Sequence, residues 1–354
     1  MEQNIFQKSD NWLKKHGPRQ HVVVSSRVRL ARNIMRIPFA AHAQSDELED
    51  VFRTVNRIIR QNPRFRDYQV IPLNETPVRA RTFLKESRII SPEMVKGAEF
   101  RAVYVNPDFH ISLMINEEDH VRIQGLTAGL NVRSISEEIF QIDDELNEKL
   151  PVAFSDQFGY LTACPTNLGT GLRVSVMLHL PGLALTKKIQ DVLTMIQPRG
   201  QTVRGFYGEN SEYDGDFYQV SNEISLGKTE EKIIEDHEKV IDSIIIREEE
   251  AREELFSNQP DTVEDAIWRS YGVLSQARLI DVKEAMNLLS RIRLGIHRGY
   301  FKTINHEKLN QMIIDIQPAH LELFELNRSA GSKKNEIARA TLLRNSFNIL
   351  GSEN

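Results

Sequence analysis

A change of pattern after Gly227 divides the sequence into two parts that must fold differently. Before it, short runs of alternating apolar and polar residues predict strands, separated by turns and isolated helices. After it, only helical periods occur, and residues 230–255 place isoleucines and valines under a dense charged face, which predicts one long helix. Residues 256–261, which include Pro260, are expected to end that helix as a linker.

The first part is predicted to form strands that pair mostly antiparallel, because their connections are short and hairpin-like. The expected strands are residues 22–26, 101–105, 111–115, 159–163, 173–180, 203–207 and 216–221. One helix is expected at residues 46–60 with Ser45 as its N-cap, and another at residues 135–150, stopped by Pro151. The predicted fold class is therefore α+β, with a largely antiparallel sheet flanked by helices.

Three segments follow from these patterns. Residues 1–21 are a polar lead-in, residues 22–256 hold the sheet, and residues 262–354 form an all-helical C-terminal domain. Helices in that last domain are expected at residues 263–274, 282–294, 306–316 and 335–350. A chain of 354 residues is long enough for two such domains.

Composition excludes several classes of protein. A net charge of −5 argues against a general binder of nucleic acid or membrane surfaces. The single cysteine, Cys164, rules out an intramolecular disulfide framework and a multi-cysteine zinc cluster, and His120 and His179 lack metal-ligand spacing, so no metal site is assigned. No apolar run resembles a signal sequence or reaches the length of a membrane span, so a cytoplasmic location is expected.

Adjacent carboxylates follow the expected strand at residues 111–115. A guanidinium is a poor nucleophile, so an enzyme that phosphorylates it must hold its planar fork and remove a proton. Carboxylates can do both, and Glu118 and Glu209 are the candidates for such a clamp. The alternative is that residues 117–119 are simply a solvated turn.

Arginines recur within the same short stretches as these carboxylates. Phosphoryl transfer depends mainly on positioning and charge neutralisation, and arginine suits both. The candidates are Arg27, Arg29, Arg122, Arg173 and Arg204. No P-loop sequence is present, but glycines at 169, 171, 205 and 208 can let backbone N–H groups approach a phosphate. Plain hairpin turns and surface salt bridges remain the alternatives for these glycines and arginines.

Cys164 stands directly before a glycine-rich turn. No partner histidine can be identified, so a buried or substrate-lining thiol is favoured over a covalent nucleophile. A thiolate at this position can still help to hold or polarise a guanidinium.

Four stretches together resemble the catalytic domain of the phosphagen (guanidino) kinases, which include the creatine and arginine kinases. They read SSRVRLARN at 25–33, NEEDHVR at 116–122, CPTNLGTGLR at 164–173 and RGFYGE at 204–209. The likeness spans about residues 22–245. It implies that Glu118 and Glu209 form the catalytic clamp, that the five arginines bind ATP phosphates, and that Cys164 is the reactive cysteine of the family.

The resemblance also implies a wider nucleotide site and its cofactors. The implied ATP-binding residues are Ser25, Ser26, Arg27, Val28, Arg29, Arg88, Arg122, Arg173, Val174, Ser175, Val176, Met177, Arg204, Gly205, Phe206, Tyr207, Gly208 and Glu209. ATP would bring Mg²⁺, held largely by phosphates and water. Arg88 stands where the family has a histidine near the nucleotide.

The arrangement of this catalytic segment with a helical C-terminal extension resembles bacterial protein-arginine kinases of the McsB type, notably at residues 181–189, 271–278 and 293–296. Phosphagen kinases carry a helical N-terminal domain that closes over a small substrate. Here residues 1–21 stand in that position, so we expect an acceptor site open enough for an arginine on a protein. The resemblance implies a catalytic role for residues 22–256 and a regulatory or substrate-binding role for residues 262–354.

One regulatory motif departs from this resemblance. The R-D-x-x-R-A motif, which forms a phosphoarginine pocket in such kinases, is replaced here at residues 335–340. The pocket would contain Asn335, Glu336, Arg339 and Ala340. Because Asn335 offers neutral hydrogen bonds in place of a charged fork, we expect weak binding of phosphoarginine.

The expected function is ATP-dependent phosphorylation of arginine side chains in proteins. Two alternatives stay open: a kinase for free arginine or another small guanidine, and a non-catalytic adaptor. The resemblance implies a role in stress response and protein quality control, with arginine-containing proteins as substrates. It also implies a Clp-type ATPase and protease, a heat-shock repressor, a zinc-binding activator and an arginine phosphatase as partners, without nucleic acid or membrane. A homodimer or higher oligomer is expected.

Overall fold

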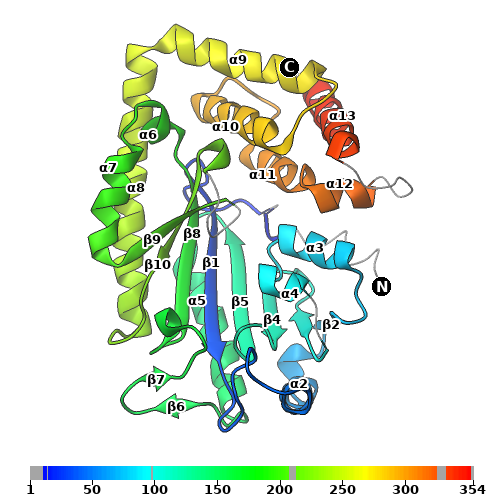
Figure 1. Ribbon diagram of the computed structural model, residues 1–354. Coiled ribbons are helices and arrows are strands. Elements are labelled where there is room, and N and C mark those ends of the chain that lie inside the picture. Colours follow the sequence, from blue (N-terminus) through cyan, green and yellow to red (C-terminus); the bar gives the residue numbers. More distant parts are fainter. Residues whose placement is uncertain (1–10, 14, 97–98, 207–212, 325–331, 352–354) are drawn as a thin grey trace.

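The large sheet is antiparallel throughout in the computed structural model of the chain, which describes residues 11–13, 15–96, 99–206, 213–324 and 332–351. Its eight strands run in the order β2-β3-β4-β5-β1-β8-β10-β9 (Figure 1). They are β1 (Val23–Arg32), β2 (Gln69–Pro72), β3 (Ala102–Val105), β4 (Ile111–Ile115), β5 (Val121–Ala128), β8 (Leu172–His179), β9 (Gln201–Gly205) and β10 (Phe217–Asn222). A separate hairpin joins β6 (Phe154–Ser155) to β7 (Gly159–Tyr160). The predicted α+β class with a largely antiparallel sheet is confirmed.

One face of the sheet packs against helices α2 (Ser45–Gln61), α5 (Val132–Asn147) and α8 (Glu230–Asn258). Apolar side chains of these helices and of the strands form one continuous core. Val28 and Leu30 of β1 point into it and are fully buried. Side chains alternate along a strand, so Arg27 and Arg29 face the opposite side.

The remaining helices lie on that opposite face, alongside α8, and at one end of the sheet. Helices α3 (Val78–Glu86) and α4 (Pro92–Val95) lie beside β2–β4, and α6 (Pro181–Leu185) and α7 (Ile189–Ile196) lie along α8 (Figure 1). The helical part lies beyond the end of the sheet at which β1 begins. It comprises α9 (Pro260–Gln276), α10 (Val282–Arg298), α11 (His306–Asp315), α12 (Pro318–Phe324) and α13 (Ser332–Gly351).

Among the helices in the described part of the chain, none is both long enough and apolar enough to cross a bilayer.

Several expected boundaries were wrong. Residues 256–261 are not a linker, since α8 continues to Asn258 and Pro260 already begins α9, where proline's missing N–H costs no helical hydrogen bond. The N-cap of α2 is Gln44 rather than Ser45, because the backbone N–H of Gln44 donates to Glu47 at 2.7 Å. Helix α5 ends at Asn147, before Pro151, and the strand expected at 159–163 is the two-residue β7.

A buried ion pair on α8 ties this helix to α6 and to the sheet. Glu248 and Arg252 are fully buried, and Arg252 Nε donates to Glu248 at 2.6 Å. Glu248 also accepts two backbone N–H groups from the first turn of α6, each at 2.9 Å. Arg252 donates to the carbonyls of His21 and His179, each at 3.1 Å. The pair thus links α8 to α6, to the end of β8 and to the segment before β1.

Glu248→Gln should therefore destabilise the fold strongly. The substitution keeps the side chain's shape but leaves Arg252 as a buried, uncompensated charge, which costs about 3–5 kcal/mol. The measurement is the midpoint of urea denaturation. The control is Glu254→Gln on the same helix, which removes an exposed pair with Lys188 and should cost less than about 1 kcal/mol. Equal effects of the two substitutions would contradict this account.

Candidate active site

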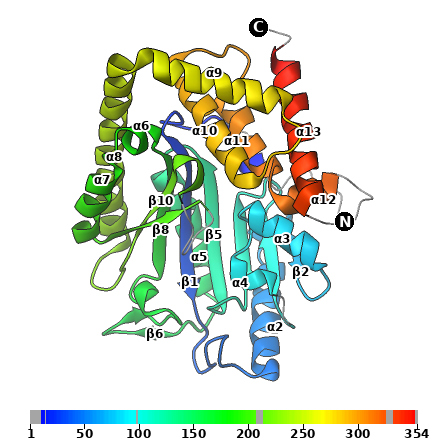
Figure 2. The same ribbon diagram turned by 45° about the horizontal axis from the view of Figure 1, so that its top comes forward.

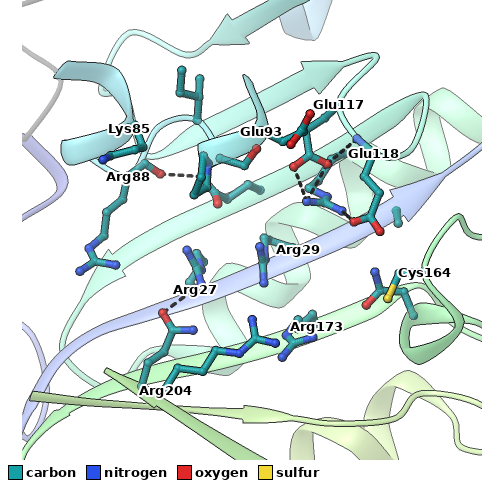
Figure 3. Close-up of a pocket in the computed structure, with 18 of the residues that line it drawn as sticks. Arg27, Arg29, Lys85, Arg88, Glu93, Glu117, Glu118, Cys164, Arg173 and Arg204 are labelled. Atoms are coloured by element: carbon teal, nitrogen blue, oxygen red, sulfur yellow. Dashed lines mark hydrogen bonds and ion pairs between the residues drawn. The ribbon is translucent and has the colours of Figure 1, made fainter. Parts of the chain in front are cut away.

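A cavity of about 950 Å³ opens on the face of the sheet turned away from α5 and α8. Its walls come from the central strands, from the segment around α3 and α4, from the loop before β8 and from the helical part. Its charged lining is mainly basic (Figure 3). The arginines are Arg27, Arg29, Arg88, Arg122, Arg173 and Arg204.

Strand pairing brings the five predicted phosphate-binding arginines into this one cavity. Arg29 of β1 lies directly opposite Arg173 of β8. Arg204 of β9 lies opposite Gln219 of β10, and Gln219 accepts a hydrogen bond from Arg27 Nη2 at 3.0 Å. Residues that are opposite each other in neighbouring strands point to the same face, so these side chains must converge.

The cluster concentrates positive charge. Burial, followed by the charge of Arg88 and of other cavity arginines, lowers the pKa of Arg27 to about 9. Burial and then the charge of Arg27 hold the pKa of Arg29 well below its ordinary value. Among the described residues, the buried Nε atoms of Arg27 and Arg29 have no hydrogen-bond partner. Buried donors and uncompensated charge fit an anion with several oxygens, such as a polyphosphate.

The three adjacent carboxylates take different positions around Arg122. Arg122 donates to Glu117 at 2.7 Å and to Glu118 at 2.9 Å, and lies 3.5 Å from Asp119. Burial would lower the pKa of Arg122, but Glu117, Asp119 and Glu118 outweigh it and raise the pKa. The side chains of Glu117 and Asp119 are 3% and 0% exposed, whereas that of Glu118 is 40% exposed at the cavity. Glu118 is thus the carboxylate best placed to meet an incoming group.

Asp119 connects this acidic turn to the loop that carries Cys164. It accepts the backbone N–H of Ala163 at 2.7 Å and an amide hydrogen of Asn33, also at 2.7 Å. Cys164 lines the cavity, and its Sγ lies 3.1 Å from Oγ1 of Thr166. That the thiol contacts the substrate, as the sequence favours, stays a prediction.

Arg88 reaches the cavity from the end of α3. Its Nη2 donates to the carbonyl of Phe206 at 2.8 Å, and its guanidinium lies 4.4 Å from the Phe206 ring centroid. Its backbone has a positive φ of 62°, which is uncommon for a residue other than glycine. The carbonyl of Arg88 accepts a hydrogen bond from Gln124 at 2.9 Å.

Other predicted ATP-binding residues do not line the cavity. Val28, Val174 and Val176 point into the core on the other face, as strand alternation requires. Ser26 is buried and donates to the carbonyl of Gly129 at 2.8 Å. The further predicted residues outside the lining are Ser25, Ser175, Met177 and Gly205. Contact of these residues with ATP stays a prediction.

The other predicted site residues are not part of the cavity as the structure describes it. Tyr207, Gly208 and Glu209 fall outside the described residues. The predicted phosphoarginine residues are on α13, where Arg339 is buried and donates to the carbonyls of Ile316 and Ile280. Asn335 lies 3.5 Å from Glu322.

The sequence did not predict several lining residues. Outside the four motif stretches they are Lys85, Glu86, Ile90, Ser91, Pro92, Glu93, Gln124, Gln219, Val282, Gln317 and Pro318. Strand alternation marks the two glutamines as cavity-facing once β5 and β10 are aligned with β1 and β8. The last three belong to the helical part, and no local pattern signals their approach.

Two family models match the chain. One is described as the C-terminal catalytic domain of ATP:guanido phosphotransferases and matches residues 48–251. The other is described as the protein-arginine kinase McsB C-terminal domain and matches residues 260–354.

Curated relatives and solved structures agree with these matches. The chain is 41% identical to protein-arginine kinases of Bacillus cereus (strain AH187) and Bacillus mycoides (strain KBAB4), covering 96% of both chains in each case. A crystal structure of lombricine kinase matches with a TM-score of 0.59 and 24% identity, over 66% of this chain and 68% of the other. A duplicated taurocyamine kinase from Schistosoma mansoni, with bound transition state analog components, also has a TM-score of 0.59 at 24% identity, over 67% of this chain and 35% of the other. These structures establish similarity of fold.

Removing one cavity charge should stabilise the ligand-free protein. Because repulsion and burial disfavour the charged form of Arg29, Arg29→Met should raise the stability by about 1 kcal/mol, the usual gain when a strained functional site is relieved. Thermal unfolding without ligand measures it. Tripolyphosphate should raise the midpoint of the wild type more than that of Arg29→Met.

The control is Arg53→Met, which removes an exposed arginine paired with Glu49 and should bring no gain. If Arg29→Met lowers the midpoint, the cluster is not under electrostatic strain.

Proposed function

This chain belongs to the ATP:guanido phosphotransferase family and, within it, to the protein-arginine kinases; from this membership and the cavity we propose that it uses ATP to phosphorylate arginine side chains of proteins. The observation that carries the proposal is the convergence of five arginines and the exposed carboxylate of Glu118 on one cavity. The arginines supply the charge that a triphosphate needs, and the carboxylate supplies a partner for a guanidinium.

The proposed reaction exchanges one bond to phosphorus for another. A nitrogen of the acceptor guanidinium bonds to the terminal phosphorus of ATP, the bond from that phosphorus to the bridging oxygen breaks, and ADP leaves. The guanidinium loses one proton, and we assign its acceptance to Glu118. Glu118 already accepts from Arg122 through Oε2, so its Oε1 can face the substrate. Glu209 is proposed as the second carboxylate of the clamp.

The five predicted phosphate-binding arginines serve the transfer by neutralising phosphate charge as it shifts toward the leaving group. Mg²⁺ bound to the nucleotide would add positive charge between the phosphates. Glu117 holds Arg122 at 2.7 Å and so fixes the one arginine that lies beside both the acidic turn and the basic cluster. Cys164, on the same rim, is proposed to contact the acceptor group rather than to bond to phosphorus.

We propose the same division of labour between domains as the sequence indicated, with catalysis in residues 22–256 and regulation or substrate binding in residues 262–354. Support comes from the cavity lining, since most of the lining residues lie within residues 22–256. A cytoplasmic role in protein quality control, with Clp-type proteolytic partners, a heat-shock repressor, a zinc-binding activator and an opposing phosphatase, is part of the proposal. An assembly of two or more copies stays a prediction.

The acceptor is tested by offering ATP with either a protein substrate or free arginine and measuring acid-labile phosphate. Label on protein arginine is the expected result. Label on free arginine alone would favour a small-guanidine kinase, and label on neither would favour an adaptor. Glu118→Gln should lower turnover on protein by about 100-fold, the usual scale of a general base, with ATP affinity largely kept.

The matched control is Glu93→Gln. Glu93 also lines the cavity and is 41% exposed, but its carboxylate pairs with Lys96 at 2.8 Å at the rim. The two substitutions remove the same charge, so only Glu118→Gln should affect the chemical step. Near wild-type turnover of Glu118→Gln would refute its assignment.

We also propose that the α13 pocket binds phosphoarginine weakly. Arg339 already donates through Nε and Nη1 to backbone carbonyls, and the carboxylate of Glu322 beside Asn335 opposes a phosphate. In a titration with free phosphoarginine, Asn335→Arg should bind about tenfold more tightly than wild type, as one added charge-assisted hydrogen bond predicts. Tight binding by wild type without gain in Asn335→Arg would overturn the proposal.

A further inference from the structure

One of the buried junctions between the helical part and the catalytic part centres on Glu86, the last residue of α3. Its carboxylate accepts the backbone N–H of Ala319 at 3.0 Å and that of His320 at 3.3 Å, in the first turn of α12. It also lies 3.0 Å from Nδ1 of the His320 ring. Figures 1 and 2 both show α12 lying against α3.

The other nitrogen of His320 completes the junction. Its Nε2 lies 3.2 Å from Oγ of Ser87, and its ring stacks on Phe83 with centroids 4.0 Å apart. The side chains of His320 and Glu86 are 1% and 7% exposed. Every polar atom of the His320 ring therefore contacts α3 or the residue after it. A buried network of this kind permits one docking geometry for α12.

The junction leads directly to the cavity. Ser87 is followed by Arg88, whose left-handed backbone turns its side chain toward Phe206. After burial, the charge of Arg88 contributes most to the lowered pKa of Arg27. Non-glycine residues hold a positive φ only where their surroundings enforce it, and the flanking contacts of Ser87 and Gln124 do so here.

The helical part also supplies a piece of the cavity wall. Gln317 and Pro318, immediately before Ala319, line the cavity, and so does Val282 at the start of α10. The segment that Glu86 fixes is thus continuous with a wall of the candidate nucleotide site. Displacing α12 must change that wall and the turn that carries Arg88 together.

We propose that Glu86, Ser87 and His320 are positioning residues for ATP, through which docking of the helical part sets the place of Arg88 and the nucleotide affinity. The inference rests on the proposed use of the cavity for ATP. A contact made by the helical part would then help to determine nucleotide affinity. The residues of this contact lie outside the predicted set of ATP-binding residues. The coupling acts on the affinity for ATP and leaves the proton transfer at Glu118 alone.

The test compares ATP affinity, by calorimetric titration, with turnover at saturating ATP in the full chain. His320→Ala should weaken ATP binding by about tenfold, within the range usual for coupling between two sites of one protein. Its turnover at saturating ATP should stay within about twofold of wild type, since only binding common to ground and transition states is lost. His320→Asn, whose amide can replace Nδ1 opposite Glu86, should recover most of the affinity.

A double-mutant cycle identifies the route. If His320 acts through Arg88, the loss caused by His320→Ala should largely disappear in an Arg88→Met background. The control is Arg344→Ala, which removes a hydrogen bond from α13 to the carbonyl of Ala277 within the helical part. It should lower the unfolding midpoint without changing ATP affinity.

The outcomes separate this inference from the proposed function. A wild type that neither binds ATP nor labels arginine overturns both. A wild type that does both, beside a folded His320→Ala that binds ATP equally well, overturns only the coupling. Additive losses in the cycle overturn the route through Arg88. Should His320→Ala not fold, Ser87→Ala removes only the hydroxyl beside Arg88 and decides by the same two measurements.

Discussion

The alternation of side chains along β1, at the centre of the sheet, is the constraint on which the rest of the structure depends. Val28 and Leu30 enter the core beneath α5 and α8, while Arg27 and Arg29 enter the cavity. A slip of one residue would reverse both faces at once. Pairing with β5 on one side and β8 on the other excludes that slip, so core and cavity are determined together.

This arrangement explains how the protein holds like charges close together. The cavity arginines repel one another, and burial together with this repulsion lowers the pKa of Arg27. The apolar neighbours of these arginines along the strand offset this cost in folding free energy, since burying each Val or Leu side chain fully contributes about 1.5–3 kcal/mol to stability. Arg122 differs from the others because Glu117 and Asp119 surround it. It forms the boundary between the basic floor of the cavity and its acidic rim.

Local patterns predicted those features that depend on local periodicity. The strands at 22–26 and 111–115 and the long helix after Gly227 follow from spacing alone, and the motifs brought the five arginines to one site as expected. The linker predicted at residues 256–261 was wrong because proline breaks a helix in its interior but is favourable in its first turn, where Pro260 lies. The Glu86–His320 contact joins residues 234 positions apart, and neither partner carries a sequence signal for the other. Contacts that depend on how distant elements pack together could therefore not be predicted from local sequence patterns.

The run Glu117-Glu118-Asp119 shows how a fold separates chemically similar groups. Asn116, with a φ of 56°, turns the chain between β4 and β5 and directs the three side chains differently. Glu117 accepts a hydrogen bond from Arg122. Asp119 accepts one from the backbone of the loop before Cys164. Glu118 shares Arg122 but keeps one side open to solvent. A carboxylate that must bind an incoming cation and release it again needs two properties: a neighbouring group that orients it, and access from solvent. Only the middle residue of the three has both, so the turn conformation, more than the residue types, singles out Glu118.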